Sequence, residues 1–228
     1  MENWDANTIE AYLFQNTGAG DKGIYPLVAL GLPLFDTDEV YYGTYAYKVE
    51  VYGNAFRLHD NLQTHLGTLG SWCIEGWHYI SSGGVGVQIW NPFVSNNWNI
   101  LGIIYRNDNN RYYKWYNGAE ASAAAGVTED AYHHFSIEWD GSKIYFYVDG
   151  ILKDSWNNVN NIFNGWATDT YIGQALYGSF NPFARINRVI ISNIRRFGVE
   201  TVPLPPQIAA GFSKDSFMGS HISKGGFR

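Results

Sequence analysis

The segment from Tyr132 to Trp156 constrains the fold more than any other part of the chain. Over 134–139 polar and apolar residues alternate, which gives a strand with one apolar and one polar face. A polar turn over 140–143 follows, and the alternation resumes beyond it. Asp149-Gly150 then tolerates the positive backbone angles of a tight type I′ hairpin. The segment therefore predicts three consecutive antiparallel strands, the first of them half buried.

The same segment resembles a known family. Its Trp139-Asp140-Gly141 turn and its Tyr147-Val148-Asp149-Gly150 hairpin, preceded by two histidines, resemble the laminin-G-like and concanavalin-A-like lectin/glucanase domains. Segment 42–49 resembles the early strand of that family, and segment 72–78 resembles its T-I-E-x-W strand. The order and spacing of these blocks match over roughly residues 1–200. The resemblance implies an all-β fold, a two-sheet antiparallel jelly-roll sandwich with an extended C-terminal arm.

The remaining segments supply the other strands of such a sandwich. We expect the following elements in chain order: a first strand near 11–14, strands near 44–52 and 55–59, a loop or short helical turn over 62–69, a strand over 72–80, an alternating segment from 85 toward Trp90, an Asn-rich surface loop over 91–99, a hairpin from 100–105 and 112–116, a helix, edge strand or loop over 119–126, and strands near 167–174 and 184–192. The closing strand extends over 188–197.

Composition and charge exclude several function classes. The 228 residues fit one large all-β domain. A net charge of −6 leaves no basic surface for phosphate groups, so we expect no nucleic acid partner. The longest apolar run, 24–35, contains prolines and is shorter than the roughly 20 residues that span a bilayer, so we expect no membrane partner. The N-terminal residues lack the features of a signal peptide. Cys73 is the single cysteine, which excludes an internal disulfide, and its strand context predicts a buried core residue.

The sequence divides at about residue 202. Residues 1–202 form the predicted sandwich, and Val202-Pro203-Leu204-Pro205-Pro206 is a stiff, polyproline-like exit from it. The segment 203–228 is rich in Pro and Gly and lacks the apolar periodicity to fold alone. We interpret it as an extended assembly arm that contacts other chains. Its candidate contact residues are Pro203, Pro205, Pro206, Phe212, Phe217 and Phe227.

Both ends of the sandwich resemble the members of the family that tailed bacteriophages encode. The opening from Trp4 to Phe14 resembles their W/D-x-x-T-x-x-x-L-x-F pattern, and the closing strand resembles D-x-(V/I)-R-(I/V)-S followed by Pro-Pro. The acidic residue of the closing motif is replaced here by Asn187 or Arg188, which puts any calcium contact of that carboxylate in doubt. The resemblance implies a virion protein that is assembled in the host cytoplasm, is extracellular as part of the particle, and contacts other virion proteins as an oligomer or part of a larger assembly.

Paired carboxylates for catalysis are not predicted. Glucanases of this fold carry Glu-x-Asp-x-x-Glu or a form one residue shorter on a strand, and the sequence has no such motif. Glu138 and Asp140 are the nearest pair, but they belong to the Trp-Asp-Gly turn that non-catalytic members also carry. Glu75 stands alone in its strand. We therefore expect no enzymatic activity.

A metal or cofactor is not predicted either. His133 and His134 are consecutive strand residues and point to opposite faces, so they cannot share an ion without a bulge. The turn 107–110 lacks the glycine and the closing glutamate of an EF-hand loop. Calcium is possible there but has no motif in its support.

Glycan binding is the chemistry most compatible with the remaining residues. Sugars present hydroxyl groups to Asn and Asp side chains and C–H faces to aromatic rings. The loops with that composition give the candidate glycan-binding residues Trp90, Asn97, Trp98, Asn107, Asp108, Asn110, Tyr112, Trp166 and Tyr177. The competing interpretation is that the aromatic residues belong to the core and that the asparagines form turns.

The combined interpretation is a non-enzymatic structural or attachment protein of a virion, a decoration, fibre or tail-associated protein whose lectin-like domain binds surface glycans. One alternative is a free or secreted bacterial carbohydrate-binding module, which would carry an export signal or a neighbouring catalytic domain. Another is a degenerate glucanase-type glycoside hydrolase, which needs two carboxylates roughly 5–9 Å apart in a groove.

Overall fold

The computed structural model describes residues 6–12, 14, 24–32, 34–37, 44–49, 55–80, 89–95, 102–106, 111–116, 119–124, 126–157, 160–164, 170–175 and 184–197. These residues form the strands β1 (Thr8–Tyr12), β2 (Val28–Leu30), β3 (Leu34–Asp36), β4 (Ala46–Val49), β5 (Ala55–Arg57), β6 (Trp72–Ile80), β7 (Ile89–Ser95), β8 (Gly102–Arg106), β9 (Arg111–Tyr116), β10 (Ala119–Ala124), β11 (Ala131–Trp139), β12 (Lys143–Val148), β13 (Ile151–Asn157), β14 (Thr170–Ala175) and β15 (Ala184–Ser192), with one helix, α1 (Asp60–Gly67).

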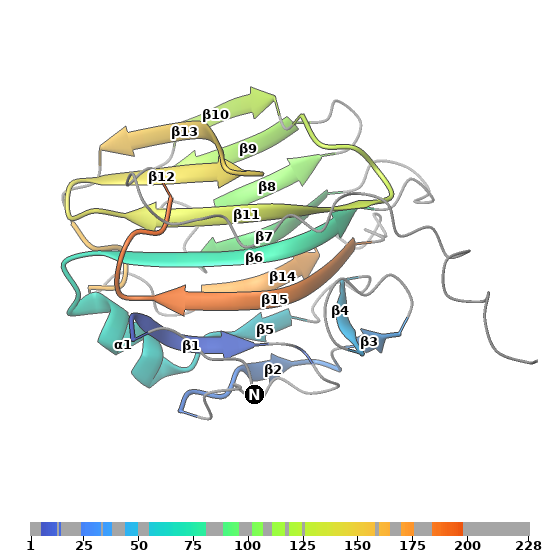
Figure 1. Cartoon of the computed structure of the whole chain (residues 1–228), viewed down its shortest axis with the longest axis horizontal. Helices are drawn as coiled ribbons and strands as arrows, with labels where there is room; N and C mark the ends of the chain where they lie inside the picture. The colour runs from blue at the N-terminus through green and yellow to red at the C-terminus, as the bar shows by residue number, and fades with distance from the viewer. Residues whose placement is uncertain are drawn as a thin grey trace, which may run out of the picture.

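The strands form two antiparallel sheets, one in front of the other in the view of Figure 1. Sheet A has the order β13-β12-β11-β6-β15-β4-β3, with β1 also paired to β15. Sheet B has the order β10-β9-β8-β7-β14-β5-β2. Neighbours in both sheets are often distant in the sequence, as expected for a jelly roll. The predicted two-sheet antiparallel sandwich is confirmed.

The central hairpins form as the alternation predicts. β11 pairs with β12 from Phe135 opposite Val148 to Trp139 opposite Ile144. The turn between β12 and β13 has φ of 50° at Asp149 and 74° at Gly150. Two consecutive positive φ angles are the requirement of a type I′ turn, and Asp and Gly tolerate them better than most residues.

The core lies between the two sheets and is closed at one end by α1. Its largest fully buried side chains are Trp72, Tyr12, Tyr47, Phe14, Phe56, Phe135, Phe146, Leu58 and Leu62. Gly76 on β6 faces this core opposite Phe135. A Cβ atom at Gly76 would lie 3.1 Å from Cζ of Phe135 and 3.1 Å from Cγ2 of Val189. The missing side chain therefore makes room for the phenyl ring.

The structure shows which elements three segments form whose prediction was left open or was wrong. The segment predicted as a loop or short helical turn is α1, which buries Leu62 and Leu66. The Ala-rich segment is β10, the edge strand of sheet B. The surface loop predicted over 91–99 is wrong for 91–95, because β7 continues to Ser95. Pro92 lies where the register between β7 and β8 shifts, and such an irregularity leaves a proline out of the hydrogen-bonded ladder.

The prediction that β11 is half buried is also wrong. Every residue over 133–139 is buried, including the polar ones on the outer face of sheet A. The chain turns back after β15, and residues 193–197 pass in front of sheet A (Figure 1). We call Asn193–Phe197 the strap. It covers polar residues that a strand pattern alone assigns to solvent.

Candidate functional site

The outer face of sheet A collects the polar and aromatic side chains that the core excludes. β6 and β11 run antiparallel, and their register places Cys73 opposite Glu138, Glu75 opposite Ser136, Trp77 opposite His134, and Tyr79 opposite Tyr132. These pairs lie on the face opposite the core, because Ile74 and Ile137 occupy the alternate, inward positions. One end of this face is polar and lies beneath the strap. The other end is aromatic.

Glu138 is the centre of the polar end. Its side chain is fully buried, with 0% exposure. Its Oε1 accepts hydrogen bonds from the backbone N–H groups of Arg196 at 2.8 Å and Phe197 at 2.6 Å, and its Oε2 accepts one from Nε of Arg195 at 3.3 Å. Burial raises the pKa of Glu138, and these three donors oppose that rise because they stabilise the carboxylate. Glu138 therefore ties the strap to β11.

Glu75 makes a second connection to the strap. Its Oε1 lies 3.2 Å from Nε of Arg196, and its Oε2 lies 3.1 Å from Nε2 of His134. Arg196 also donates to Oγ of Ser192 and to Oγ1 of Thr8. Glu75 thus pairs with a guanidinium and an imidazole, not with a second carboxylate. Its partners come from strands and a segment that are distant in the sequence.

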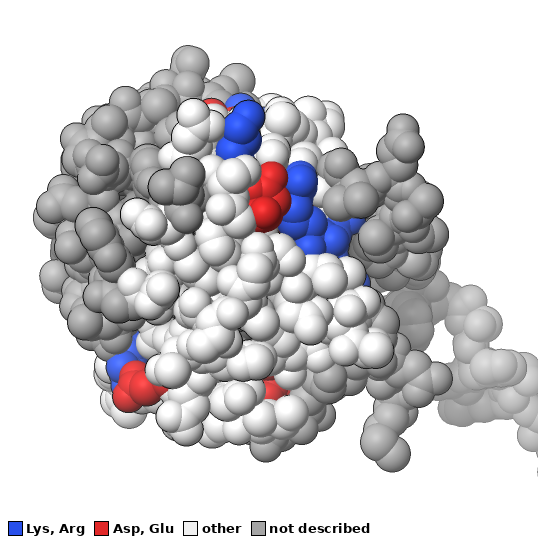
Figure 2. Space-filling view, turned by 90° about the vertical axis from the view of Figure 1, so that its left-hand side faces the viewer, with Lys and Arg blue, Asp and Glu red and all other residues white. Residues whose placement is uncertain are grey.

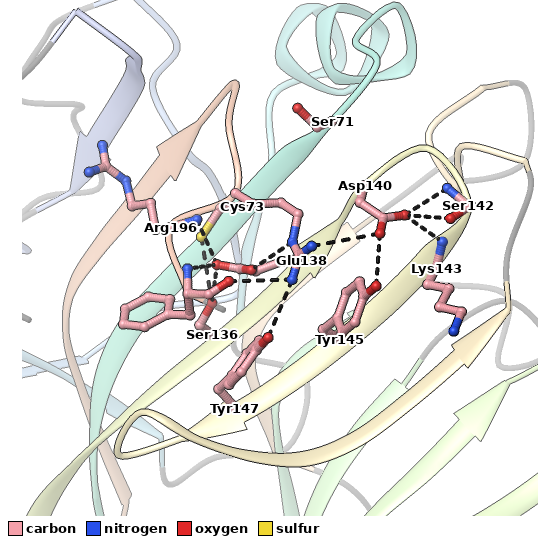
Figure 3. A network of polar contacts seen from close by, with 12 residues as sticks. Ser71, Cys73, Ser136, Glu138, Asp140, Ser142, Lys143, Tyr145, Tyr147 and Arg196 are labelled. Atoms are coloured by element: carbon pink, nitrogen blue, oxygen red, sulfur yellow. Dashed lines mark hydrogen bonds and ion pairs between the residues drawn. The ribbon is translucent and has the colours of Figure 1, made fainter. Parts of the chain in front are cut away.

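Asp140 and Tyr145 form the outer edge of the polar end. Asp140 accepts hydrogen bonds from the backbone N–H groups of Ser142 and Lys143, both at 2.8 Å, and from the hydroxyl of Tyr145 at 2.8 Å (Figure 3). Burial alone would raise the pKa of Asp140, but these donors hold it well below its usual value. The guanidinium carbon of Arg195 lies 4.0 Å from the centroid of the Tyr145 ring.

The three carboxylates are engaged within the protein. Glu138 and Asp140 share Arg195, at 3.3 Å and 3.7 Å, and Glu75 pairs with Arg196. At the end of the sandwich that carries the β11–β12 turn, acidic and basic atoms lie in contact on an otherwise largely uncharged described surface (Figure 2). A glycosidase needs carboxylates that reach the scissile bond. These groups instead fix the strap.

The aromatic end consists of Trp77, Tyr79 and Tyr132, which we call the platform. Trp77 and Tyr132 are partly exposed, and the rings of Tyr79 and Tyr132 have centroids 5.3 Å apart. The ring of Trp77 contacts the imidazole of His134 edge-on, with centroids 5.1 Å apart. Rings on two adjacent strands of a sheet form a rigid aromatic surface, since the backbone ladder fixes their spacing.

A short turn before β11 borders the platform. Glu129 and Asp130 are both exposed, and Asp130 has a φ of 58°. The hydroxyl of Tyr79 donates to Oδ1 of Asp130 at 3.4 Å. This contact holds a carboxylate at the edge of the aromatic rings. Aromatic faces beside short polar side chains are the composition that sugar rings require.

The two adjacent histidines of β11 point to opposite faces, as predicted. Nδ1 of His133 lies 2.7 Å from Oδ2 of Asp149, whereas His134 contacts Glu75 on the outer face. Burial alone would raise the pKa of Asp149, but the hydrogen bond with His133 holds it below its usual value. Inside the core, burial lowers the pKa of His78 to about 3. The described residues contain no group of three His, Cys, Asp or Glu side chains arranged to hold a metal ion.

The glycan-binding residues predicted from the sequence are not tested by the structure. The side chains of Trp90 on β7 and Tyr112 on β9 are not described, although both strands are. The other candidates and the whole arm lie outside the described residues, namely Asn97, Trp98, Asn107, Asp108, Asn110, Trp166, Tyr177, Pro203, Pro205, Pro206, Phe212, Phe217 and Phe227.

The platform itself was missed by sequence reasoning, although a signal for it exists. Trp77 and Tyr79 alternate with the inward-facing Ile74, Gly76 and His78, so the period of two assigns both rings to the outer face. The alternation of β11 does the same for Tyr132. Large aromatic residues on the solvent side of two paired strands are unusual enough to mark a site.

A family model agrees with this architecture. Residues 53–193, more than half of the chain, match the model Laminin_G_3 of the concanavalin A-like lectin/glucanases superfamily. The chain belongs to this superfamily. The family that the sequence resembles is therefore confirmed. No curated protein matches the chain.

Solved structures similar to this chain include binding domains and part of an enzyme. Domain 4 of AbnA, an extracellular GH43 arabinanase from Geobacillus stearothermophilus solved with arabinotriose, has a TM-score of 0.57 at 14% identity, over 83% of this chain and 93% of that domain. The receptor-binding domain of a botulinum neurotoxin C/D mosaic serotype has a TM-score of 0.57 at 12% identity, over 82% and 48%. Trypanosoma rangeli sialidase has a TM-score of 0.59 at 11% identity, over 84% and 31%. These similarities establish the fold.

In the described part of the chain, α1 falls short of the length and apolar character that a membrane-crossing helix needs.

Proposed function

We propose that the chain is a non-enzymatic carbohydrate-binding module and that its platform, Trp77, Tyr79 and Tyr132, binds the glycan. The observation that carries the proposal is the pair of partly exposed rings, Trp77 and Tyr132, on adjacent strands at the aromatic end of the outer face of sheet A. A pyranose ring places its C–H face on such rings while its hydroxyl groups bind polar neighbours. Asp130 supplies an acceptor at the edge of the platform.

The engaged carboxylates support a binding role over hydrolysis. Glu138 is fully buried and accepts hydrogen bonds from four donors, Ser136 among them, and Glu75 is 6% exposed and has two partners. Using either as a nucleophile or as a proton donor would require the strap to leave. The similarity in fold to a domain solved with arabinotriose fits a carbohydrate ligand.

We further propose that the module is displayed on a virion through its C-terminal arm. The opening and closing motifs that resemble phage-encoded members support this context, as does the Pro-rich exit at 202–206. A truncation after Val202 is expected to abolish docking onto parent particles while leaving a folded monomer. Equal docking of the truncated and full-length chains would exclude the arm as the assembly element.

The platform is tested by replacing Trp77 or Tyr132 with alanine and measuring binding to an array of polysaccharides. Each replacement should weaken binding about tenfold or more, as for a ring at the centre of an interface. Tyr171 is the matched control, because it is a partly exposed tyrosine on the other sheet. If Trp77→Ala and Tyr171→Ala bind as the unmodified protein does, the platform is not the binding site.

A further inference from the structure

We infer that His134 is a positioning residue of the platform, because its imidazole fixes the ring of Trp77 in the orientation that a glycan meets. This role rests on the proposed glycan-binding function. His134 lies directly opposite Trp77 in the register of β11 and β6. The two ring centroids are 5.1 Å apart at an interplanar angle of 66°, and ring pairs across adjacent strands stabilise each other in such edge-on contacts. His134 is only 5% exposed, so it acts on the glycan through Trp77.

The imidazole of His134 is itself held by two further contacts. Its Nε2 lies 3.1 Å from Oε2 of Glu75, and since a carboxylate accepts hydrogen bonds, the Nε2–H group is the donor. The ring of Phe197, from the strap, has its centroid 4.8 Å from that of the imidazole. A hydrogen bond at one nitrogen and rings from Trp77 and Phe197 therefore restrict the rotation of the imidazole.

Both groups that hold His134 are anchored on the strap. The Oε1 atom of Glu75 lies 3.2 Å from Nε of Arg196, and Glu75 is 6% exposed, so the position of its carboxylate depends on the strap. The backbone N–H of Phe197 donates to Oε1 of the buried Glu138 at 2.6 Å, which fixes the ring of Phe197 over the sheet. The contacts thus continue from the strap through His134 to the glycan-binding ring, and they join the polar end of the outer face to the aromatic end.

A ring that is already fixed in the free protein binds more tightly than one that the glycan must order. Ordering one mobile side chain on binding weakens affinity about two- to tenfold. His134→Ala should therefore weaken glycan binding by about this factor, and less than the loss of the Trp77 ring itself does. His134→Phe keeps a ring beside Trp77 and should retain most of the affinity, whereas His134→Gln keeps a donor for Glu75 without a ring and should behave as alanine does.

The experiment combines affinity electrophoresis of the full chain, in gels that contain β-glucan, arabinan, mannan, polygalacturonate or alginate, with fluorine NMR of the fluorotryptophan-labelled protein. The chain has nine tryptophans, so the Trp77 resonance is identified by its loss in Trp77→Phe. We expect His134→Ala and His134→Gln to reduce retardation and to move the Trp77 resonance. Ile137→Val is the matched control, because it weakens the same strand from the core side and should leave both readouts unchanged.

Three results would overturn the role of His134 and keep the platform. The first is unchanged retardation of His134→Ala by a polymer that no longer retards Trp77→Ala. The second is reduced retardation of His134→Ala with an unmoved Trp77 resonance, because the effect would then not pass through that ring. The third is full binding by His134→Gln and weakened binding by His134→Phe, which would assign the effect to the hydrogen bond with Glu75. If no polymer retards the protein in a Trp77-dependent way, the proposed function falls and this role of His134 with it.

Discussion

Replacing Glu138 with alanine would show how much the strap contributes to stability. The change leaves two backbone N–H groups and the guanidinium of Arg195 without their acceptor in a site where Glu138 is 0% exposed. Breaking a buried charged pair by removing one partner costs about 3–5 kcal/mol. The strap can partly open to water, so we expect the lower end, about 3 kcal/mol. For a chain of this size that loss lowers Tm by roughly 6–12 °C.

The measurement is urea unfolding followed by tryptophan fluorescence, since urea does not screen the ion pairs as a salt would. Hydrogen exchange of the Arg196 and Phe197 amides gives a local readout, because both donate to Glu138. The matched control is Glu129→Ala, an exposed glutamate, which should change the free energy of unfolding by less than about 0.5 kcal/mol. A cost below about 1 kcal/mol for Glu138→Ala, with unchanged exchange of the two amides, would refute a structural role of the strap.

The pH dependence of the same site has a definite sign. Burial raises the pKa of Glu138 in the folded protein, so the folded state binds the proton more readily than the unfolded chain does. The unmodified protein should therefore gain stability relative to Glu138→Gln as the pH falls through the raised pKa toward the unfolded value of about 4.3. Glutamine keeps an acceptor for the two amides, and its cost at neutral pH should be less than half that of alanine. A difference that shrinks on acidification would contradict this assignment.

Two further predictions concern the core. Gly76→Ala should lower the free energy of unfolding in urea by about 1–3 kcal/mol, because the new Cβ atom lies 3.1 Å from atoms of Phe135 and Val189. Gly70→Ala is the control and should cost far less, because nothing lies within 4 Å of its new Cβ atom. Equal costs would show that the ring of Phe135 moves to make room. The imidazole of His78 should stay neutral in NMR titrations down to about pH 4, because burial lowers its pKa to about 3. Its contribution to stability is therefore present above the unfolded pKa of about 6.5 and is lost as the pH falls toward 3. An inflection of its NMR signals near pH 6.5 would contradict its burial.

Local pattern was enough to predict the central hairpins and the face that β11 and β12 turn to the core. β11, β12 and β13 lie where the alternation and the Asp-Gly turn place them, and Phe135, Ile137 and Trp139 are buried as predicted. These features depend on neighbours within a few residues. The same reasoning predicted a loop for the segment 91–95, because Asn and Pro normally indicate loops. A register shift between β7 and β8 instead lets these residues continue a strand.

The sequence by itself determined the sandwich, the family, the absence of an internal disulfide and the opposite directions of His133 and His134, because period and composition act locally. Only the tertiary structure decided what lies on the outer face of sheet A. The local pattern identifies Glu138 and Glu75 only as polar strand residues. Their partners Arg195 and Arg196 belong to the strap, more than fifty residues further along the chain. Burial of a charge depends on partners that no local pattern contains, and the platform is exposed where the strap does not reach.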